Sequence, residues 1–285
     1  MNDTLNILIP YGYKEPTEAD VRTGKNYVLR RESAARGLSS LVDAMLEDAA
    51  EKITRLCYQY NVNPKDFLIS SKYDEKLFEQ IAQILDNLED EILDIVLEYS
   101  MRCTESDKRR NILLPWIVML GRDNMNLRQT LEKRLWSFSR DLEAMIVAVR
   151  LAKYDMAKAV TRIKTNLHAV YVMPEMLAAF KQASKLKATY IKTKGVKHGN
   201  VGSSNSEANN IDRFAKTTLQ MVWMRNQSLN YEEKGAAGYA VLRGSSYPCD
   251  LCDSKVGWHP ITDTESFPPQ HPSCVCYTVP IFKTE

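Results

Sequence analysis

Residues 127–167 read LRQTLEKRLWSFSRDLEAMIVAVRLAKYDMAKAVTRIKTNL and carry the longest apolar pattern of the 285-residue chain. Apolar side chains recur there every three or four residues, the spacing that places them on one face of an α-helix. The members of this stripe are Leu127, Leu131, Leu135, Phe138, Leu142, Met145, Val149, Met156, Ile163 and Leu167. Pro174 is expected to break or kink the helix. The stretch predicts a long helix whose apolar face packs against other helices.

Two upstream stretches show the same period. A stripe from about residue 33 to 60 consists of Leu38, Leu41, Met45, Ala49, Ile53, Leu56 and Tyr60. A second stripe, with Ser71 as the expected N-cap of its helix, consists of Leu77, Ile81, Ile84, Leu88, Ile92, Ile95 and Tyr99. Between Gly37 and Gly195 the only glycine is Gly121, as expected of helical sequence. The three patterns together predict a long-helix hairpin or bundle.

The remaining sequence suggests four regions. Residues 1–30 show no clear period and are expected to form an extended N-terminal arm, and residues 31–192 form the helical domain. The Gly-, Ser- and Asn-rich residues 193–210 are expected to be a flexible loop or linker. Residues 211–285 are expected to form a small α+β domain, with an amphipathic helix followed by strands at 239–242 and 277–281. The predicted fold class is mainly α with a small, loop-rich α+β C-terminal domain.

Composition limits the class of protein. The longest apolar run, Ile112–Gly121, is shorter than the roughly 18 residues that a membrane span needs, and it contains a proline. The first residues lack a basic segment followed by a long apolar stretch, so no secretory signal is expected. These features predict a protein that folds in a reducing cytoplasm and has no membrane partner.

Charge is segregated although the net charge is only +2. Residues 63–101 hold 3 Lys/Arg against 10 Asp/Glu, net −7, whereas residues 102–200 hold 20 against 8, net +12. The basic region 102–200 is a candidate surface for the phosphate backbone of DNA or for an acidic partner. The alternative is that acidic and basic helices lie side by side and each charge run is a solvated face.

Four of the six cysteines gather near the C-terminus. Cys249 and Cys252 form a Cys-x2-Cys pair, and after eighteen residues His271, Cys274 and Cys276 follow. Such spacing is typical of structural Zn²⁺ sites, in which four Cys or His ligands close a tetrahedron. The five candidates exceed the four positions, and the spacing does not choose among His271, Cys274 and Cys276. A site filled by protein ligands is structural rather than catalytic.

The C-terminal cysteines allow two other interpretations. The four would form disulfides in an oxidising compartment, or the Cys-x2-Cys pair Cys249 and Cys252 would act as a redox motif. Cys57 and Cys103 lie in helical patterns and are expected to be inert and buried. His259 is an alternative ligand, although a hydrogen-bonded histidine is the simpler expectation. His168 is expected at a core boundary, and His198 has no evident partner.

The C-terminal residues resemble a known family. Their ordered pattern is Cys249-x2-Cys252, Gly257, Pro268-Pro269-x-His271-Pro272-x-Cys274-x-Cys276 and Val279-Pro280. It resembles the C-terminal motif of phage head morphogenesis (minor head) proteins, typified by the F protein of phage Mu, over residues 210–282. The resemblance implies a virion protein present in several copies, which acts in head morphogenesis at the portal vertex, contacts the portal and other head proteins, and lies near packaged DNA.

The resemblance also leaves alternatives. Family members often carry an Arg-Thr-Glu stretch upstream of the cysteines, and the nearest counterpart here is Lys216-Thr217-Thr218, which lacks the glutamate. Some members are related to ADP-ribosyltransferases, so an enzyme or effector delivered with the genome is one alternative. A zinc-containing nucleic-acid-binding protein is another. The sequence shows no phosphate-binding, dinucleotide-binding or hydrolase motif, so no catalytic or cofactor-binding residue is predicted and the expected protein is not an enzyme.

Overall fold

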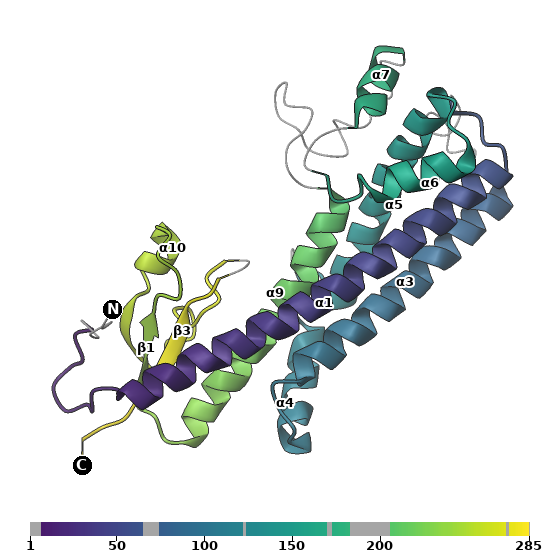
Figure 1. The fold of residues 1–285 in the computed structure, drawn as a ribbon. Helices are drawn as coiled ribbons and strands as arrows, with labels where there is room; N and C mark the ends of the chain where they lie inside the picture. Colours follow the sequence, from purple (N-terminus) through teal and green to yellow (C-terminus); the bar gives the residue numbers. More distant parts are fainter. Residues whose placement is uncertain are drawn as a thin grey trace. The chain divides into compact units, whose positions relative to one another are not determined.

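The computed structural model describes residues 7–64, 74–121, 124–169, 173–182, 206–271 and 274–284. In these ranges the chain is mainly helical with one small antiparallel sheet, which confirms the predicted fold class (Figure 1). The helices are α1 (Glu18–Gln59), α3 (Glu75–Met101), α4 (Asp107–Val118), α5 (Leu127–Leu151), α6 (Met156–Lys164), α7 (Pro174–Gln182), α9 (Glu207–Glu233) and α10 (Asp250–Asp253). The strands are β1 (Gly238–Leu242), β2 (Gly257–Pro260) and β3 (Tyr277–Ile281).

Side-chain caps explain where several helices begin. The N-cap Asn126 of α5 accepts from the backbone N–H of Gln129, whose side chain accepts from the Asn126 N–H. The apolar pattern of 127–167 is divided into α5 and α6, which corrects the prediction of one helix. Lys153 adopts φ +59° after α5, and the Asp155 carboxylate caps α6 by accepting from the backbone N–H of Lys158. A stripe at helical spacing continues through such a turn, so periodicity alone does not reveal it.

The chain divides into two compact units, each built from separate stretches of sequence. The first consists of residues 1–39, 95–120 and 215–285, and the second of residues 40–94 and 121–214. The helices α1, α3 and α9 each begin in one unit and end in the other. The units differ from the predicted domains 31–192 and 211–285, because each end of a long helix packs into a different core. Of the predicted linker 193–210, residues 193–205 lie outside the described residues and Glu207 begins α9.

The second unit consists of helices held by apolar packing and ion pairs. Its buried side chains include Leu46, Ile53, Leu85, Leu88, Ile92, Leu131, Leu135 and Leu142. Arg128 on α5 bridges to Glu89 and Asp90 on α3 at 2.6 and 2.9 Å. On α6, Arg162 pairs with Glu175 of α7 at 2.9 Å. The predicted stripes therefore form a helical core, while the Ser71 cap lies outside the described residues.

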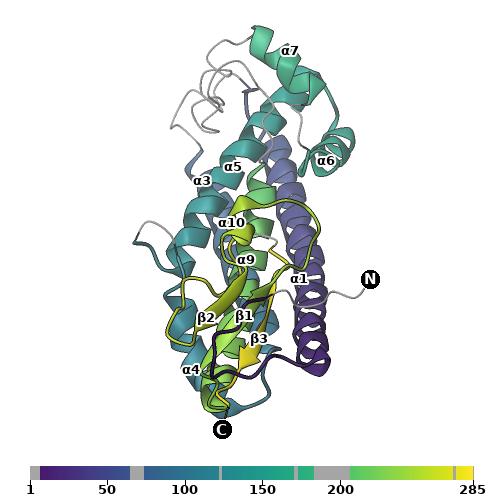
Figure 2. The same ribbon diagram turned by 90° about the vertical axis from the view of Figure 1, so that its left-hand side faces the viewer.

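The first unit contains the sheet, whose strand order is β2-β1-β3 with both pairings antiparallel. The predicted strands at 239–242 and 277–281 correspond to β1 and β3, whereas β2 was not predicted. In both ribbon views the sheet lies beside α9 and the first half of α1 (Figures 1 and 2). One cluster contains Tyr231, Ala236, Tyr239, Val241, Cys252, Cys274 and Cys276, and the other Val28, Ala240, Tyr277, Val279 and Ile281. Alternate residues of β1 thus serve two cores, as expected of a strand.

The N-terminal segment completes this unit. Residues 7–17 precede α1 and include a turn at Tyr11 and Gly12. They pair with the residues that follow β3: Lys14 N–H donates to the Phe282 carbonyl at 2.8 Å, and Thr284 N–H donates to the Gly12 carbonyl at 2.9 Å. The predicted extended arm of residues 1–30 is wrong from Glu18 onward, where α1 begins. Thr17 and Asp20 cap this end reciprocally, since each side chain accepts from the other's backbone N–H. Thr17 and Asp20 have the spacing of a capping box, but no helix was predicted after them because residues 1–30 show no clear apolar period.

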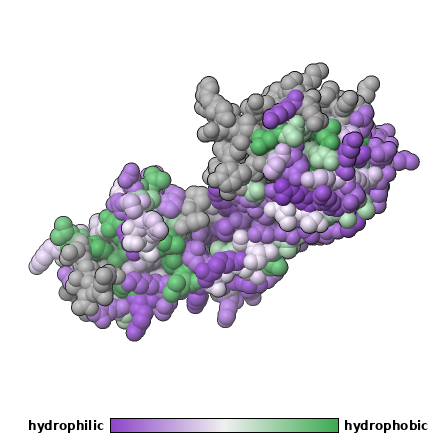
Figure 3. Space-filling model, turned by 45° about the horizontal axis from the view of Figure 1, so that its top comes forward, coloured by the Kyte–Doolittle hydropathy of each residue, from purple (hydrophilic) through white to green (hydrophobic). Residues whose placement is uncertain are grey.

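The face of the molecule in Figure 3 is mostly hydrophilic, and its apolar side chains gather in small groups among hydrophilic ones. None of the helices in the described ranges combines the length and apolar character needed to cross a bilayer. The apolar run at 112–121 instead forms much of α4, in which Leu113 and Ile117 are buried.

Candidate metal centre

The five candidate ligands come from two neighbouring segments of the first unit. Cys249 is the N-cap residue of the four-residue helix α10, and Cys252 lies within this helix. The Asp253 N–H donates to the Cys249 carbonyl at 2.8 Å, and the Cys249 N–H donates to the Asp253 carboxylate at 3.1 Å. Arg243 in turn pairs with Asp253 and with the Tyr247 carbonyl. These bonds fold the Cys-x2-Cys stretch into a tight turn with both thiols near one point.

The second segment precedes and enters β3. His271 lies before the residues that lead to Cys274, and the Cys274 N–H donates to the His271 carbonyl at 3.1 Å. Cys274 and Cys276 lie on the approach to β3 and are 1% and 2% exposed. Gly244, which follows β1, lies against this segment so closely that an added Cβ would be 1.8 Å from the Val275 carbonyl oxygen. A residue without a side chain is required there for the cysteine segment to lie in place.

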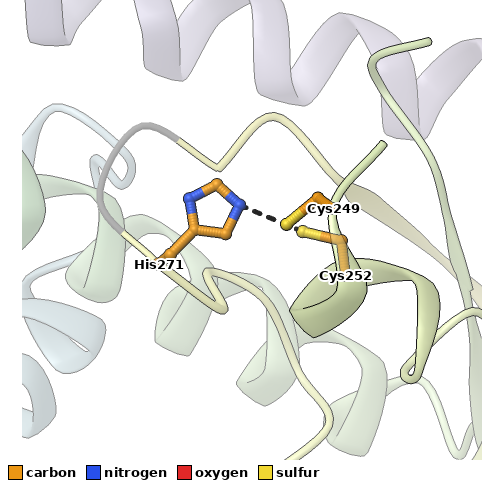
Figure 4. Close-up of side chains that lie close together, drawn as sticks. All are labelled: Cys249, Cys252 and His271. Carbon is orange, nitrogen blue, oxygen red and sulfur yellow. Dashed lines mark hydrogen bonds between the residues drawn. The ribbon is translucent and has the colours of Figure 1, made fainter. Parts of the chain in front are cut away.

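The donor atoms form two groups that share Cys252. Cys249, Cys252 and His271 have donor atoms within 4.8 Å of one another, and so do Cys252, Cys274 and Cys276. Figure 4 shows the His271 ring pointing toward the two cysteines of the α10 turn, and its Nε2 lies 3.1 Å from the Cys252 sulfur. The Cys252 and Cys274 sulfurs are 3.7 Å apart. All five predicted ligands are therefore brought together, and their positions suit a metal ion.

The chemistry of the donors and their spacing fit a tetrahedral ion. Zn–S bonds of about 2.3 Å place two sulfurs of a tetrahedron about 3.8 Å apart, close to the 3.7 Å between Cys252 and Cys274. The 3.1 Å between Cys252 and His271 is a hydrogen-bond distance, which a bound zinc would widen to about 3.6 Å. Thiolates and an imidazole select zinc or another soft transition metal over magnesium or calcium, which prefer oxygen.

Within the cluster the pKa is lowered for two of the thiols and raised for the other two. The pKa of Cys249 is lowered, chiefly because the Cys252 backbone N–H donates to its sulfur. A hydrogen bond from the Cys276 thiol lowers the pKa of Cys274 to about 5, and the same bond raises the pKa of Cys276. Burial raises the pKa of Cys252 to about 12. Cys274 is thus favoured as a thiolate at neutral pH, the form that binds metals, and Cys249 ionises more readily than an ordinary thiol.

The other cysteines behave differently. Burial raises the pKa of Cys57 and of Cys103 to about 12, so both remain thiols at neutral pH. This agrees with the expectation that they are inert, although Cys103 is only half-buried. All six cysteines are free, so the disulfide interpretation of the C-terminal cluster has no counterpart in the structure.

The two other histidines of the described residues, His168 and His259, lie outside both donor groups. His259 lies in β2, and its ring nitrogens are 3.0 Å from the Asp263 carboxylate and 2.9 Å from the Lys255 carbonyl oxygen. Its ring also stacks on Tyr239, so it is a hydrogen-bonded histidine rather than a ligand. The half-buried His168 bonds Asn209 at 3.0 Å, as expected of a boundary position. His198 lies outside the described residues.

Arg31 is a residue of this site that the sequence prediction missed. Its side chain is fully buried in α1, and its Nη2 donates to the Cys274 carbonyl oxygen at 2.5 Å. The only readable signal is positional: Arg31 occupies a place in the buried stripe that contains Val28, Ala35 and Leu38. A charged residue in an apolar stripe indicates a specific partner, but the sequence does not say which.

Part of the predicted basic region is paired with acids. Six of its basic side chains form ion pairs within the described residues: Arg102–Glu98, Arg109–Glu233, Arg128–Glu89, Arg128–Asp90, Arg134–Glu207, Arg162–Glu175, Lys164–Glu47 and Lys164–Glu51. For these six side chains the arrangement is the one that the alternative interpretation of the charge segregation expects. Residues 183–200, which hold five of the twenty basic side chains, lie outside the described residues.

Comparison of the chain with family models, with curated proteins and with solved structures finds no match. The fold and the site define a helical protein with a small sheet and, beside it, a cluster of Cys and His side chains positioned to hold a metal ion.

Proposed function

We propose that the chain is a non-catalytic structural protein whose first unit is held together by one zinc ion. The observation that carries the proposal is the convergence of five Cys and His donors on Cys252, which belongs to both donor groups. Cys252 together with three of Cys249, His271, Cys274 and Cys276 would complete a tetrahedron. With all four positions filled by the protein, no position remains for water or substrate, so the zinc acts as a cross-link.

The small core explains why a metal would be needed. The sheet has three strands of four or five residues. In the apolar cluster that contains Tyr239, three of the seven buried residues are the cysteines Cys252, Cys274 and Cys276. Thiolates buried together without a cation repel one another, whereas binding to zinc stabilises them and links the α10 turn to β3. The metal thus supplies stability that so few apolar side chains cannot.

For the biological role we propose a phage minor head protein that acts in head morphogenesis. The ordered motif over residues 249–280 supports this role, and so does the meeting of its cysteines and histidine in one centre. In this proposal the protein belongs to the virion at the portal vertex, is made in the host cytoplasm, and contacts portal and head proteins. DNA contact would use those basic residues of region 102–200 that lack acidic partners.

Metal content and stability of matched variants test the zinc cross-link. We expect one zinc per chain in the wild type and in Cys103→Ser, which changes a cysteine outside the cluster. Cys252→Ser should contain no zinc and should melt at a clearly lower temperature. A wild type without stoichiometric zinc would contradict the proposal, and so would a Cys252→Ser variant that melts with the wild type.

Association with the portal tests the role. The chain would be co-expressed with the portal protein encoded in the same genome and separated by size-exclusion chromatography with light scattering, and purified particles would be examined by mass spectrometry. The proposal predicts co-elution and peptides of this chain in the particles. Separate elution together with absence from the particles would contradict it.

A further inference from the structure

Arg31 joins the N-terminal helix to the metal centre. Its Nη2 donates to the Cys274 carbonyl oxygen at 2.5 Å, and its Nε and Nη2 donate to the Glu32 carboxylate at 3.1 and 3.0 Å. Gln220 of α9 donates to the same carboxylate oxygen at 3.0 Å. The guanidinium is therefore held between its own helix, α9 and the segment that carries two of the five donors.

The burial of Arg31 raises the energetic cost of losing its hydrogen bond to the Cys274 carbonyl oxygen. The side chain is fully buried, and its Nη1 has no hydrogen-bond partner among the residues that the structure describes. A buried guanidinium with few acceptors is costly to desolvate, and loss of one charge-assisted bond leaves further donors unsatisfied. The half of α1 around Arg31 consequently depends on the Cys274 carbonyl being held in position.

Other contacts of α1 reach the same stretch of chain. An added Cβ on Gly24 would lie 2.6 Å from the Thr278 carbonyl oxygen, and the Lys25 ammonium lies 5.8 Å from the centroid of the Tyr277 ring. Val28 belongs to the apolar cluster of Tyr277, Val279 and Ile281. The partners of this helix face therefore follow Cys274 and Cys276 directly in sequence, where metal binding would order the chain.

We propose that the metal centre acts as a clasp that fixes residues 18–39 of α1 to β3 through Arg31. This inference rests on the proposed zinc site. Metal binding places the Cys274 carbonyl, and the carbonyl holds Arg31, so docking of this half of α1 and metal affinity are thermodynamically coupled. Coupling is reciprocal: if the metal stabilises the docked helix, Arg31 raises the affinity for the metal by the same factor.

Hydrogen exchange along α1 tests the clasp in the intact chain, because this helix belongs to both units. We expect removal of zinc by a chelator to reduce amide protection in residues 18–39, while residues 40–56 of the same helix keep theirs. Equal protection of residues 18–39 with and without zinc would overturn the clasp. So would a uniform loss along the whole helix, since that indicates general unfolding rather than local release.

Affinity measurements on matched variants test the reciprocal effect. Arg31→Met retains the length of the side chain, and Arg30→Met changes the exposed neighbour on the same helix. Competition with a chromophoric chelator should show about tenfold weaker zinc binding for Arg31→Met, within the usual range of coupling between sites, and unchanged binding for Arg30→Met. Equal affinities of Arg31→Met and wild type would overturn the clasp alone. Absence of zinc from the wild type would instead overturn the proposed metal site.

Discussion

The Arg31 guanidinium bonds the carbonyl oxygen of Cys274, 243 residues later in the chain. This bond, with the pairing of Lys14 and Phe282, makes the N-terminal segment part of the unit that holds the Cys/His cluster. The C-terminal region is therefore completed by residues far away in sequence.

A C-terminal fragment tests this dependence. Residues 211–285 alone lack Val28 and the rest of the first half of α1, so one face of the sheet would be uncovered. We expect the fragment to show poorly dispersed amide signals in a ¹⁵N–¹H NMR spectrum even with zinc added. A well-dispersed spectrum from the fragment would show that the region folds without the N-terminus.

The contact at Gly24 predicts sensitivity to one methyl group. Gly24→Ala places a Cβ 2.6 Å from the Thr278 carbonyl oxygen, so α1 and β3 must separate. We expect the free energy of unfolding to fall by about 1–3 kcal/mol, as for other overpacked sites, measured by urea denaturation. Ser33→Ala, at an exposed position of α1, should be nearly neutral; an equally stable Gly24→Ala variant would argue against close packing.

Tyr231 predicts the effect of a single buried hydroxyl. Its OH donates to the Thr278 carbonyl oxygen at 2.9 Å and accepts from the Gln227 amide at 2.8 Å. Tyr231→Phe leaves both partners unsatisfied and should cost about 1–3 kcal/mol. Tyr11→Phe at an exposed position is the control, and indistinguishable urea midpoints for the two variants would contradict the assigned bonds.

Glu175 predicts a pH-dependent contribution in the second unit. Burial opposes its charge, but hydrogen bonds from Arg162 and Tyr154 prevail and lower its pKa from 4.5. The stabilisation is therefore present above pH 4.5 and is lost as the pH falls through the lowered value. Glu175→Gln should lose about 1.5–3 kcal/mol at pH 7, the range of a hydrogen bond to a charged group, and less at a pH below 4.5, where the carboxyl group becomes protonated. The exposed Glu105→Gln should show neither effect, and a loss for Glu175→Gln that is constant with pH would contradict the ion pair.

Because Cys252 belongs to both donor groups, we expect its substitution to affect zinc binding more than substitution of Cys276 does. In the proposed site five donors serve four positions, so Cys276→Ser would leave four candidate ligands in Cys249, Cys252, His271 and Cys274. We expect Cys276→Ser to retain one zinc per chain in native mass spectrometry, whereas Cys252→Ser loses it. Loss of zinc from Cys276→Ser with retention in Cys252→Ser would reverse the assignment.

The sequence predicted those helices and strands whose side chains follow a short-range apolar period. The stripes of α3 and α5, the strands β1 and β3, and the cysteine spacing were readable because helix faces, strands and turns follow short-range rules. The start of α1 at Glu18 was missed because its buried face toward β3 includes Gly24 and Arg31 rather than a run of large apolar residues. Bonds such as that of Arg31 to Cys274 depend on tertiary packing, which periodicity does not encode.

Zinc K-edge X-ray absorption of the purified wild type tests the central claim most directly. The proposed zinc cross-link predicts a shell of three or four sulfurs at about 2.3 Å, completed by one imidazole nitrogen at about 2.0 Å where His271 is the fourth ligand, the geometry of a closed structural site. A shell of oxygen and nitrogen without sulfur would contradict a zinc cross-link at Cys252.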